Sequence, residues 1–209
     1  MAGEGRQSRN DRLTKPQSGA WASSSVDFVV LVRHLRKHSS EFAAANGGNC
    51  SPYALCAIPM LLSALRCLMI ECEAQARPGQ SSLEAFTRPN DLMAMLECYG
   101  VPASLLDEAK WLNEVRNEIL HPAHLPSGTE DNWPAYLRGL KATGVLQSTG
   151  NPGADFDLIA QLSSHRLLAW SCRVARDLAE IVIRFHAERL PLVSNFLDTW
   201  NSIAVADER

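Results

Sequence analysis

The sequence lacks both an excess of positive charge and the motifs that mark the most widespread catalytic sites. Its 20 Lys and Arg are outnumbered by 23 Asp and Glu, for a formal net charge of −3. Because nonspecific binding along nucleic acid depends on many cations, a protein that coats DNA or RNA through bulk charge is excluded. The chain also contains no glycine-rich phosphate loop, no G-x-S-x-G and no H-E-x-x-H. Any nucleic-acid function must therefore rest on a few placed residues.

The cysteines lack the spacing of a metal or redox site. No C-x-x-C pair occurs, and most cysteines lie within apolar, helix-like segments. Such cysteines behave as small apolar side chains, so we expect reduced thiols in the core. They are Cys50, Cys56, Cys67, Cys72, Cys98 and Cys172. The N-terminal segment has no continuous apolar run of the secretory type, so we expect a cytoplasmic protein, in which thiols stay reduced.

Residues 1–24 differ in composition from the rest of the chain. They are rich in Gly, Ser, Gln and Asn, show no apolar periodicity, and carry four basic and two acidic residues, a net charge of +2. This composition predicts a disordered, solvated tail, with a weak electrostatic arm as the alternative. The total of −3 then leaves −5 on residues 25–209, which we expect to form a single domain.

Residues 53–70 form an almost continuous apolar run, near the minimum length of a membrane span. Pro59, Ser63 and Arg66 interrupt the run, and acidic residues follow it directly. The central helix of a soluble bundle is apolar nearly all round, and it accounts for this pattern better. We therefore expect no membrane association.

Apolar periodicity along the chain predicts helices and little else. Ser51 before Pro52 predicts the start of one long apolar helix, and Ser164 predicts the start of another. Ser104, followed by Asp107, is predicted to cap a third helix. No internal repeat or hairpin signal is present, which favours an all-α helical bundle of about five to seven helices. The expected helices cover about residues 26–45, 52–74, 82–99 with a break near 88–89, 104–120, 133–142, 164–188 and 191–203.

The histidines do not complete a metal site. His34 and His38 lie one turn apart on a helix, and His121 and His124 form an H-x-x-H pair. Two ligands do not hold a metal ion by themselves, because structural and catalytic sites use at least three protein ligands. We expect His34 and His38 on the surface, and no metal or other cofactor.

The segment around residues 111–122 has a different pattern. On a helix, Leu112, Val115 and Ile119 form an apolar stripe, and Arg116 lies about 40° from Leu112, on the shoulder of that stripe. Burial of an unpaired guanidinium is costly, so this arginine must have a partner or line a cleft. Asn117 is four residues before His121, at the helix end. The pattern therefore gathers a cation, an amide and an imidazole at one helix end.

These three groups suit cleavage of a phosphodiester. Histidine titrates near neutrality and can accept a proton from a 2′-hydroxyl, while arginine can hold a phosphate through two hydrogen bonds. RNA supplies its own nucleophile, so no metal is needed. In the alternative, Arg116 pairs with Glu71 or Glu73, and His121 ends the helix near the negative pole of its dipole. Spacing and composition alone favour this structural role.

The run from Arg116 through Asn117 to His121 resembles the R-x4–6-H signature of HEPN domains, and the following proline and the preceding L-x-x-V-R-N pattern are similar as well. The resemblance covers residues of about 50–190. It implies a metal-independent endoribonuclease, often of the toxin or defence type, that leaves a 2′,3′-cyclic phosphate. It also implies a homodimer whose two motifs face one cleft, with Arg116 stabilising the phosphate, Asn117 orienting it and His121 acting as base.

The resemblance leaves a second function open. Some HEPN domains act as non-catalytic modules for dimerisation or for binding nucleotides or proteins. The expected partners are RNA, as the substrate of a nuclease, and an antitoxin or other regulatory protein. Lys110, Arg138 and Lys141 lie near the motif in sequence, but Glu114 and Glu118 dilute their charge. The charge pattern favours RNA only slightly. Glu118 is placed on the solvated face and outside the catalytic set.

Overall fold

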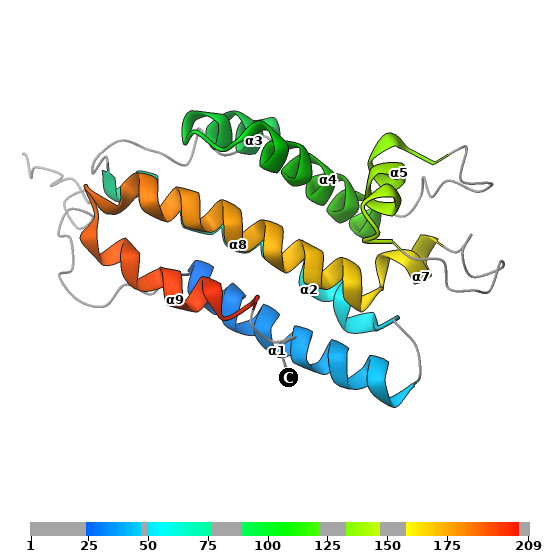
Figure 1. Ribbon diagram of the computed structural model, residues 1–209. Coiled ribbons are helices and arrows are strands. Elements are labelled where there is room, and N and C mark those ends of the chain that lie inside the picture. The colour runs from blue at the N-terminus through cyan, green and yellow to red at the C-terminus, as the bar shows by residue number, and fades with distance from the viewer. Residues whose placement is uncertain (1–23, 47–49, 77–88, 122–132, 147–157, 205–209) are drawn as a thin grey trace, which may run out of the picture.

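The computed structural model describes residues 24–46, 50–76, 89–121, 133–146 and 158–204 (Figure 1). Within these ranges the chain forms eight α-helices and one 3-10 helix, with no strand beyond an isolated bridge between Cys50 and Ser164. The predicted all-α helical bundle is confirmed. The helices are α1 (Ser24–Ala45), α2 (Pro52–Ala76), α3 (Pro89–Cys98), α4 (Ala103–Leu120), α5 (Ala135–Ala142), α7 (Leu158–Leu162), α8 (His165–Ala187), the 3-10 helix η4 (Pro191–Asn195) and α9 (Phe196–Asn201).

The count exceeds the expected five to seven because α7 and α9 are short segments of five and six residues. Ser24, the last residue of the predicted tail, begins α1, while residues 1–23 and 205–209 lie outside the described residues. The prediction of a disordered tail therefore falls on residues that the structure does not describe. The helix α2 is long and apolar enough to cross a membrane, and half of its most apolar stretch is buried inside the bundle.

The helix α2 lies at the centre of the bundle and packs against α1, α4 and α8. Figure 1 shows α8 between two groups, with α3 and α4 on one side and α1 and α9 on the other. Leu61, Leu65 and Leu68 on α2 have no exposed surface. Burial of a leucine side chain contributes about 1.5–3 kcal/mol. An apolar helix of this kind is stable only because several neighbours cover it.

The first residues of α2 and α8 lie together. The N–H of Ser51 donates to the carbonyl of Ser163 at 2.8 Å, beside the bridge between Cys50 and Ser164. Ser51 Oγ accepts from the N–H of Tyr53 at 3.3 Å, and Ser164 Oγ accepts from the N–H of Leu167 at 3.1 Å. Both serines therefore begin their helices as the sequence predicted, with Pro52 in the first turn of α2.

The predicted cap of α4 is wrong. The helix begins at Ala103, with Pro102 at the N-cap position and no side chain accepting there. Because the N-cap position lies two residues earlier than expected, Ser104 lies inside the first turn of the helix rather than ahead of it. Asp107 instead accepts a hydrogen bond from Lys110 at 3.0 Å on the exposed face. The fixed φ of Pro102 starts this helix without a capping hydroxyl.

The expectation that all six cysteines are core thiols is partly wrong. Cys72 and Cys172 are buried, Cys50 and Cys67 are half-buried, and Cys56 and Cys98 are exposed, all as free thiols. Cys56 lies near the start of α2, where the covering helices leave one face open, and Cys98 ends the short α3. Apolar character alone did not reveal which faces of α2 and α3 remain uncovered.

We expect Ser164→Ala to lower the free energy of unfolding by about 1 kcal/mol, because the orphan N–H groups of α8 lose their capping hydroxyl. Ser104→Ala is the matched control. Its hydroxyl is exposed inside the first turn of α4, and alanine is a better helix former there. Urea unfolding followed by circular dichroism measures both. Equal losses in the two variants would show that Ser164 has no special role.

We expect maleimide labelling of the folded protein at about pH 8 to modify Cys56 and Cys98 quickly, because both are exposed and only thiolates react. Cys72 should resist. Burial, with help from the charges of Glu71 and Glu73, raises the pKa of Cys72 to about 12, so its thiol stays protonated at this pH. Mass spectrometry of digests identifies the labelled sites. Labelling of Cys72 as fast as of Cys56, without denaturant, would contradict the buried position.

Candidate functional site

The predicted site residues lie on the last turn of α4 and directly after it. The buried face of this helix is held in the core by Leu106, Ala109, Leu112 and Val115. Arg116 and Asn117 are half-buried at the edge of that buried face, and His121 is exposed. The sequence-based placement of Arg116 on the shoulder of the apolar stripe is consistent with its partial burial.

Arg116 lines a small cavity between α2, α3 and α4. Its Nη1 donates to Asn117 Oδ1 at 3.0 Å. The cavity has a volume of about 40 Å³, and a second arginine, Arg66 of α2, also lines it. The remaining lining residues are Leu62, Ser63, Leu92 and Asn113. Two arginines, an asparagine and a serine thus line one cavity.

Sequence reasoning missed Arg66 as a site residue. Its signal was present, since Arg66 is one of three residues that interrupt the apolar run of residues 53–70. The interruption argued against a membrane span, and nothing in the spacing connected it with a residue 50 positions later. Only the packing of α4 on α2 brings Arg66 and Arg116 to the same cavity.

His121 ends α4, as the following proline predicted. Its backbone has φ −131° and ψ 63°, outside the helical region, and its N–H donates to the carbonyl of Asn117 at 2.8 Å. Asn117 therefore binds Arg116 through its side chain and His121 through its backbone. Among the residues that the structure describes, no hydrogen bond joins the side chains of Arg116 and His121 directly.

The two carboxylates expected as alternative partners of Arg116 bind other groups. Glu71 accepts from both the N–H and the Oγ of Ser25, at 3.3 and 2.7 Å, and so fastens the start of α1 to α2. Glu73 accepts from the hydroxyl of Tyr99 at 3.1 Å, and its Oε1 lies 3.6 Å from Nε2 of the buried His186. Burial and the nearby charge of Glu73 raise the pKa of Tyr99, which keeps the phenol neutral.

Glu118 is less solvated than expected. The helical pattern predicts that Glu118 lies on the solvent-exposed face of α4. In the structure it is half-buried and close to Tyr136 of α5. Burial first, and then the charge of Glu118, raises the pKa of Tyr136. The phenol therefore stays neutral, and α5 lies against the last turns of α4.

The histidine pairs are placed as follows. His34 and His38 are exposed on α1, as expected, and His38 Nδ1 lies 3.1 Å from Glu41 Oε2. His124 lies outside the described residues. Over the described ranges no group of three or more His, Cys, Asp or Glu side chains could hold a metal ion.

No protein-family model, no curated protein and no solved structure matches this chain. What the protein does must therefore be inferred from the residues and geometry of the chain itself.

The stability of Arg116 variants distinguishes a site residue from a structural one. We expect Arg116→Ala to change the free energy of unfolding by about 1 kcal/mol or less, since it loses one hydrogen bond at a half-buried position. Arg36→Ala is the comparison. Arg36 is 2% exposed and donates to the carbonyl of Ile203, so its loss should cost about 2–3 kcal/mol. Chemical denaturation of both variants measures the difference. A larger cost for Arg116 would assign it to the fold.

Proposed function

We propose that the protein is a metal-independent endoribonuclease of the HEPN type, with its active site at the end of α4. One observation carries the proposal. The last turn of α4 presents a half-buried Arg116 on a cavity that Arg66 also lines, and Asn117 connects this arginine with the exposed His121. In this proposal the cavity holds the phosphate and the exposed imidazole supplies the base, and cleavage at a 2′-hydroxyl requires both functions.

The cavity has a size and a positive charge that suit the oxygen atoms of a phosphate. A buried water needs roughly 10–15 Å³ of this kind of space, so about 40 Å³ accommodates about three waters. Arginine binds phosphate through two parallel hydrogen bonds, and charge developing on the phosphate in the transition state strengthens them. Arg66 and Arg116 approach from different helices, so a phosphate between them accepts from two directions.

His121 supplies the base. Its imidazole accepts the proton of the 2′-hydroxyl, and the 2′-oxygen attacks the adjacent phosphorus. The bond from phosphorus to the 5′-oxygen of the next nucleotide breaks, and that oxygen takes a proton from solvent. The products are a 2′,3′-cyclic phosphate and a free 5′-hydroxyl, so RNA is cut and DNA, which lacks the nucleophile, is not. Asn117 holds Arg116 in place for the developing charge.

A second copy of the chain would complete the site in this proposal. Leu120, directly before His121, is 44% exposed, which leaves an apolar side chain beside the imidazole. A two-fold interface brings the same patch of both subunits together and would cover this leucine. Two sets of Arg66, Arg116 and His121 would then face one cleft, which compensates for the acidic charge of the chain as a whole.

We expect the purified protein to cleave total RNA in the presence of EDTA. His121→Ala should reduce the rate by about 10²–10⁴-fold, because the general base is lost. Arg116→Ala should reduce it by about 10²–10³-fold, and Arg66→Ala should reduce it as well, because each loses a group that stabilises the phosphate. Gel electrophoresis and end-group analysis for the cyclic phosphate measure the reaction.

The matched controls are exposed residues of the same kinds on other helices. His34→Ala removes an exposed histidine of α1, and Arg184→Ala removes an exposed arginine of α8, so both should cleave as the wild type does. Cleavage by His121→Ala at the wild-type rate would refute this site. A wild type that does not cut RNA would favour the non-catalytic module, and a strictly monomeric protein in solution would contradict the shared cleft.

A further inference from the structure

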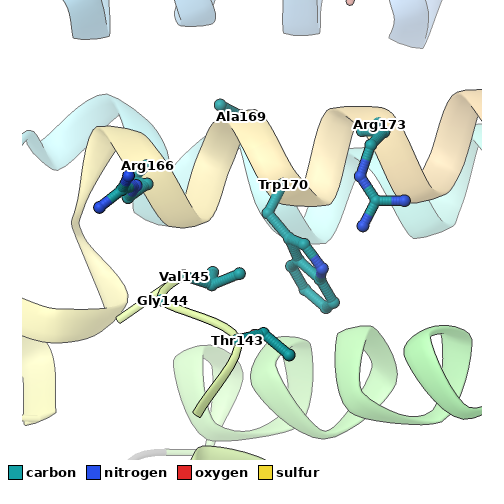
Figure 2. A pocket seen from close by; sticks show the side chains of 7 residues that line it. All are labelled: Thr143, Gly144, Val145, Arg166, Ala169, Trp170 and Arg173. Carbon is teal, nitrogen blue, oxygen red and sulfur yellow. The ribbon is translucent and has the colours of Figure 1, made fainter. Parts of the chain in front are cut away.

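Two contacts between an acidic and a basic side chain join α8 to neighbouring helices. In the first half of α8, Arg173 donates to both carboxylate oxygens of Glu108 of α4. Figure 2 shows this arginine beside Trp170, where it lines a cleft of about 330 Å³. In the last turn of α8, Nε2 of His186 lies 3.6 Å from Oε1 of Glu73 of α2. The first contact joins groups that stay charged near neutral pH, whereas the second depends on a proton on the imidazole.

The contact between His186 and Glu73 is shielded from water. His186 is 2% exposed, and the side chain of Glu73 is 13% exposed. The rings of Tyr99 and Phe185 lie roughly perpendicular to the imidazole, with centroids 5.3 and 5.1 Å from its own. Because salt and water screen buried charges much less than exposed ones, a charge on the imidazole interacts strongly with the carboxylate at this distance.

The titratable groups that the described residues place beside this pair come from α2 and α3. The hydroxyl of Tyr99, in the turn between α3 and α4, donates to the same oxygen of Glu73 at 3.1 Å. Burial first, and then the charge of Glu73, raises the pKa of Tyr99, so the phenol stays neutral. Burial also raises the pKa of Cys72, the neighbour of Glu73 on α2, to about 12. Cys98, the last residue of α3, is an exposed thiol.

Other charged side chains near this end of the bundle face water or bind elsewhere. Glu71 of α2 accepts hydrogen bonds from Ser25 of α1. The charged residues of the last turn of α8, of the segment after it and of α9 are exposed. They are Arg184, Glu188, Arg189 and Asp198. Exposed charges are screened by water and salt, so Glu73 has the largest influence on the imidazole among the charges that the structure describes.

We propose that His186 and Glu73 form a pH-dependent latch that joins the end of α8 to the end of α2. When His186 carries a proton, its imidazolium pairs with the carboxylate. Tyr99, bound to the same oxygen, connects the turn before α4 to this pair. When the proton leaves, 3.6 Å is too long for a hydrogen bond, and the ionic contact between α8 and α2 is lost.

The latch is separate from the proposed ribonuclease site. Figure 1 shows the end of α8 at the opposite end of the bundle from α5 and the end of α4. A failure of one proposal therefore leaves the other standing.

The latch stabilises the fold at the lower end of the neutral pH range. A carboxylate this close favours the imidazolium and outweighs the cost of burying its charge. His186 therefore keeps its proton to a higher pH in the folded protein than in the unfolded chain, where a histidine titrates near about pH 6.5. The stabilisation is complete below that pH, and it is lost as the pH rises through the higher value of the folded state.

Urea unfolding of the full-length protein at about pH 6 and about pH 8.5 tests the latch. We expect His186→Gln and Glu73→Gln each to lower the urea midpoint, with a loss at the lower pH at least about twice that at the higher pH. Arg173→Gln is the matched control. It breaks the other contact of α8, between groups that do not titrate in this range, so its loss should be equal at both pH values.

A second measurement needs no variant and so does not depend on whether the substituted proteins fold. Nuclear magnetic resonance follows the titration of the imidazoles in the wild type, with His186 identified by its proximity to the rings of Tyr99 and Phe185. We expect its midpoint to lie above that of His34, which is exposed on α1. The proposal is overturned if the midpoint of His186 lies at or below that of His34, or if both latch variants lose the same stability at the two pH values.

Discussion

The helix α2 is apolar along most of its length, and the bundle is arranged around covering its buried face. α1, α4 and α8 each take part of its surface, and the start of α8 is hydrogen-bonded to the start of α2. With an apolar surface of this extent, the hydrophobic effect determines which helices must pack where, and the polar contacts adjust the register. Glu71 and Glu73, near the end of the same helix, bind Ser25 on one side and Tyr99 on the other.

The candidate site is a by-product of that packing. Arg66 interrupts the apolar surface of α2 at the place where α4 crosses it, and Arg116 lies on the edge of α4 that faces the same gap. The two arginine side chains therefore line one small cavity between these helices. His121 follows the last residue of the same helix, because a residue before a proline is disfavoured in the helical conformation.

Local signals predicted much of the fold, and contacts between distant segments explain what they missed. Ser51 with Pro52, Ser164, and the proline after His121 each specify a helix end through their own backbone and side chains, and the structure places those ends as expected. The prediction that Ser104 caps α4 was wrong, because Pro102 occupies the N-cap position. Which cysteines are exposed depends on which helices cover them. Arg66 and Arg116 line one cavity only because two helices pack together whose residues lie 50 positions apart in the sequence. The same limit applies to Glu108 and Arg173, whose contact no periodicity within either helix could reveal.

The hydrogen bond from Arg36 to the carbonyl of Ile203 spans 167 residues and ties α1 to the segment after α9. The buried guanidinium of Arg36 therefore has this acceptor only after the segment that contains Ile203 has packed against α1. During synthesis on the ribosome, α1 and α2 can pair early, but the layer that contains α1 and α9 cannot close until residue 203 has emerged. Contacts this distant in sequence slow folding, because the chain must first lose the entropy of a long loop. The complete bundle, with the cavity beside Arg116, therefore closes only once residue 203 reaches α1.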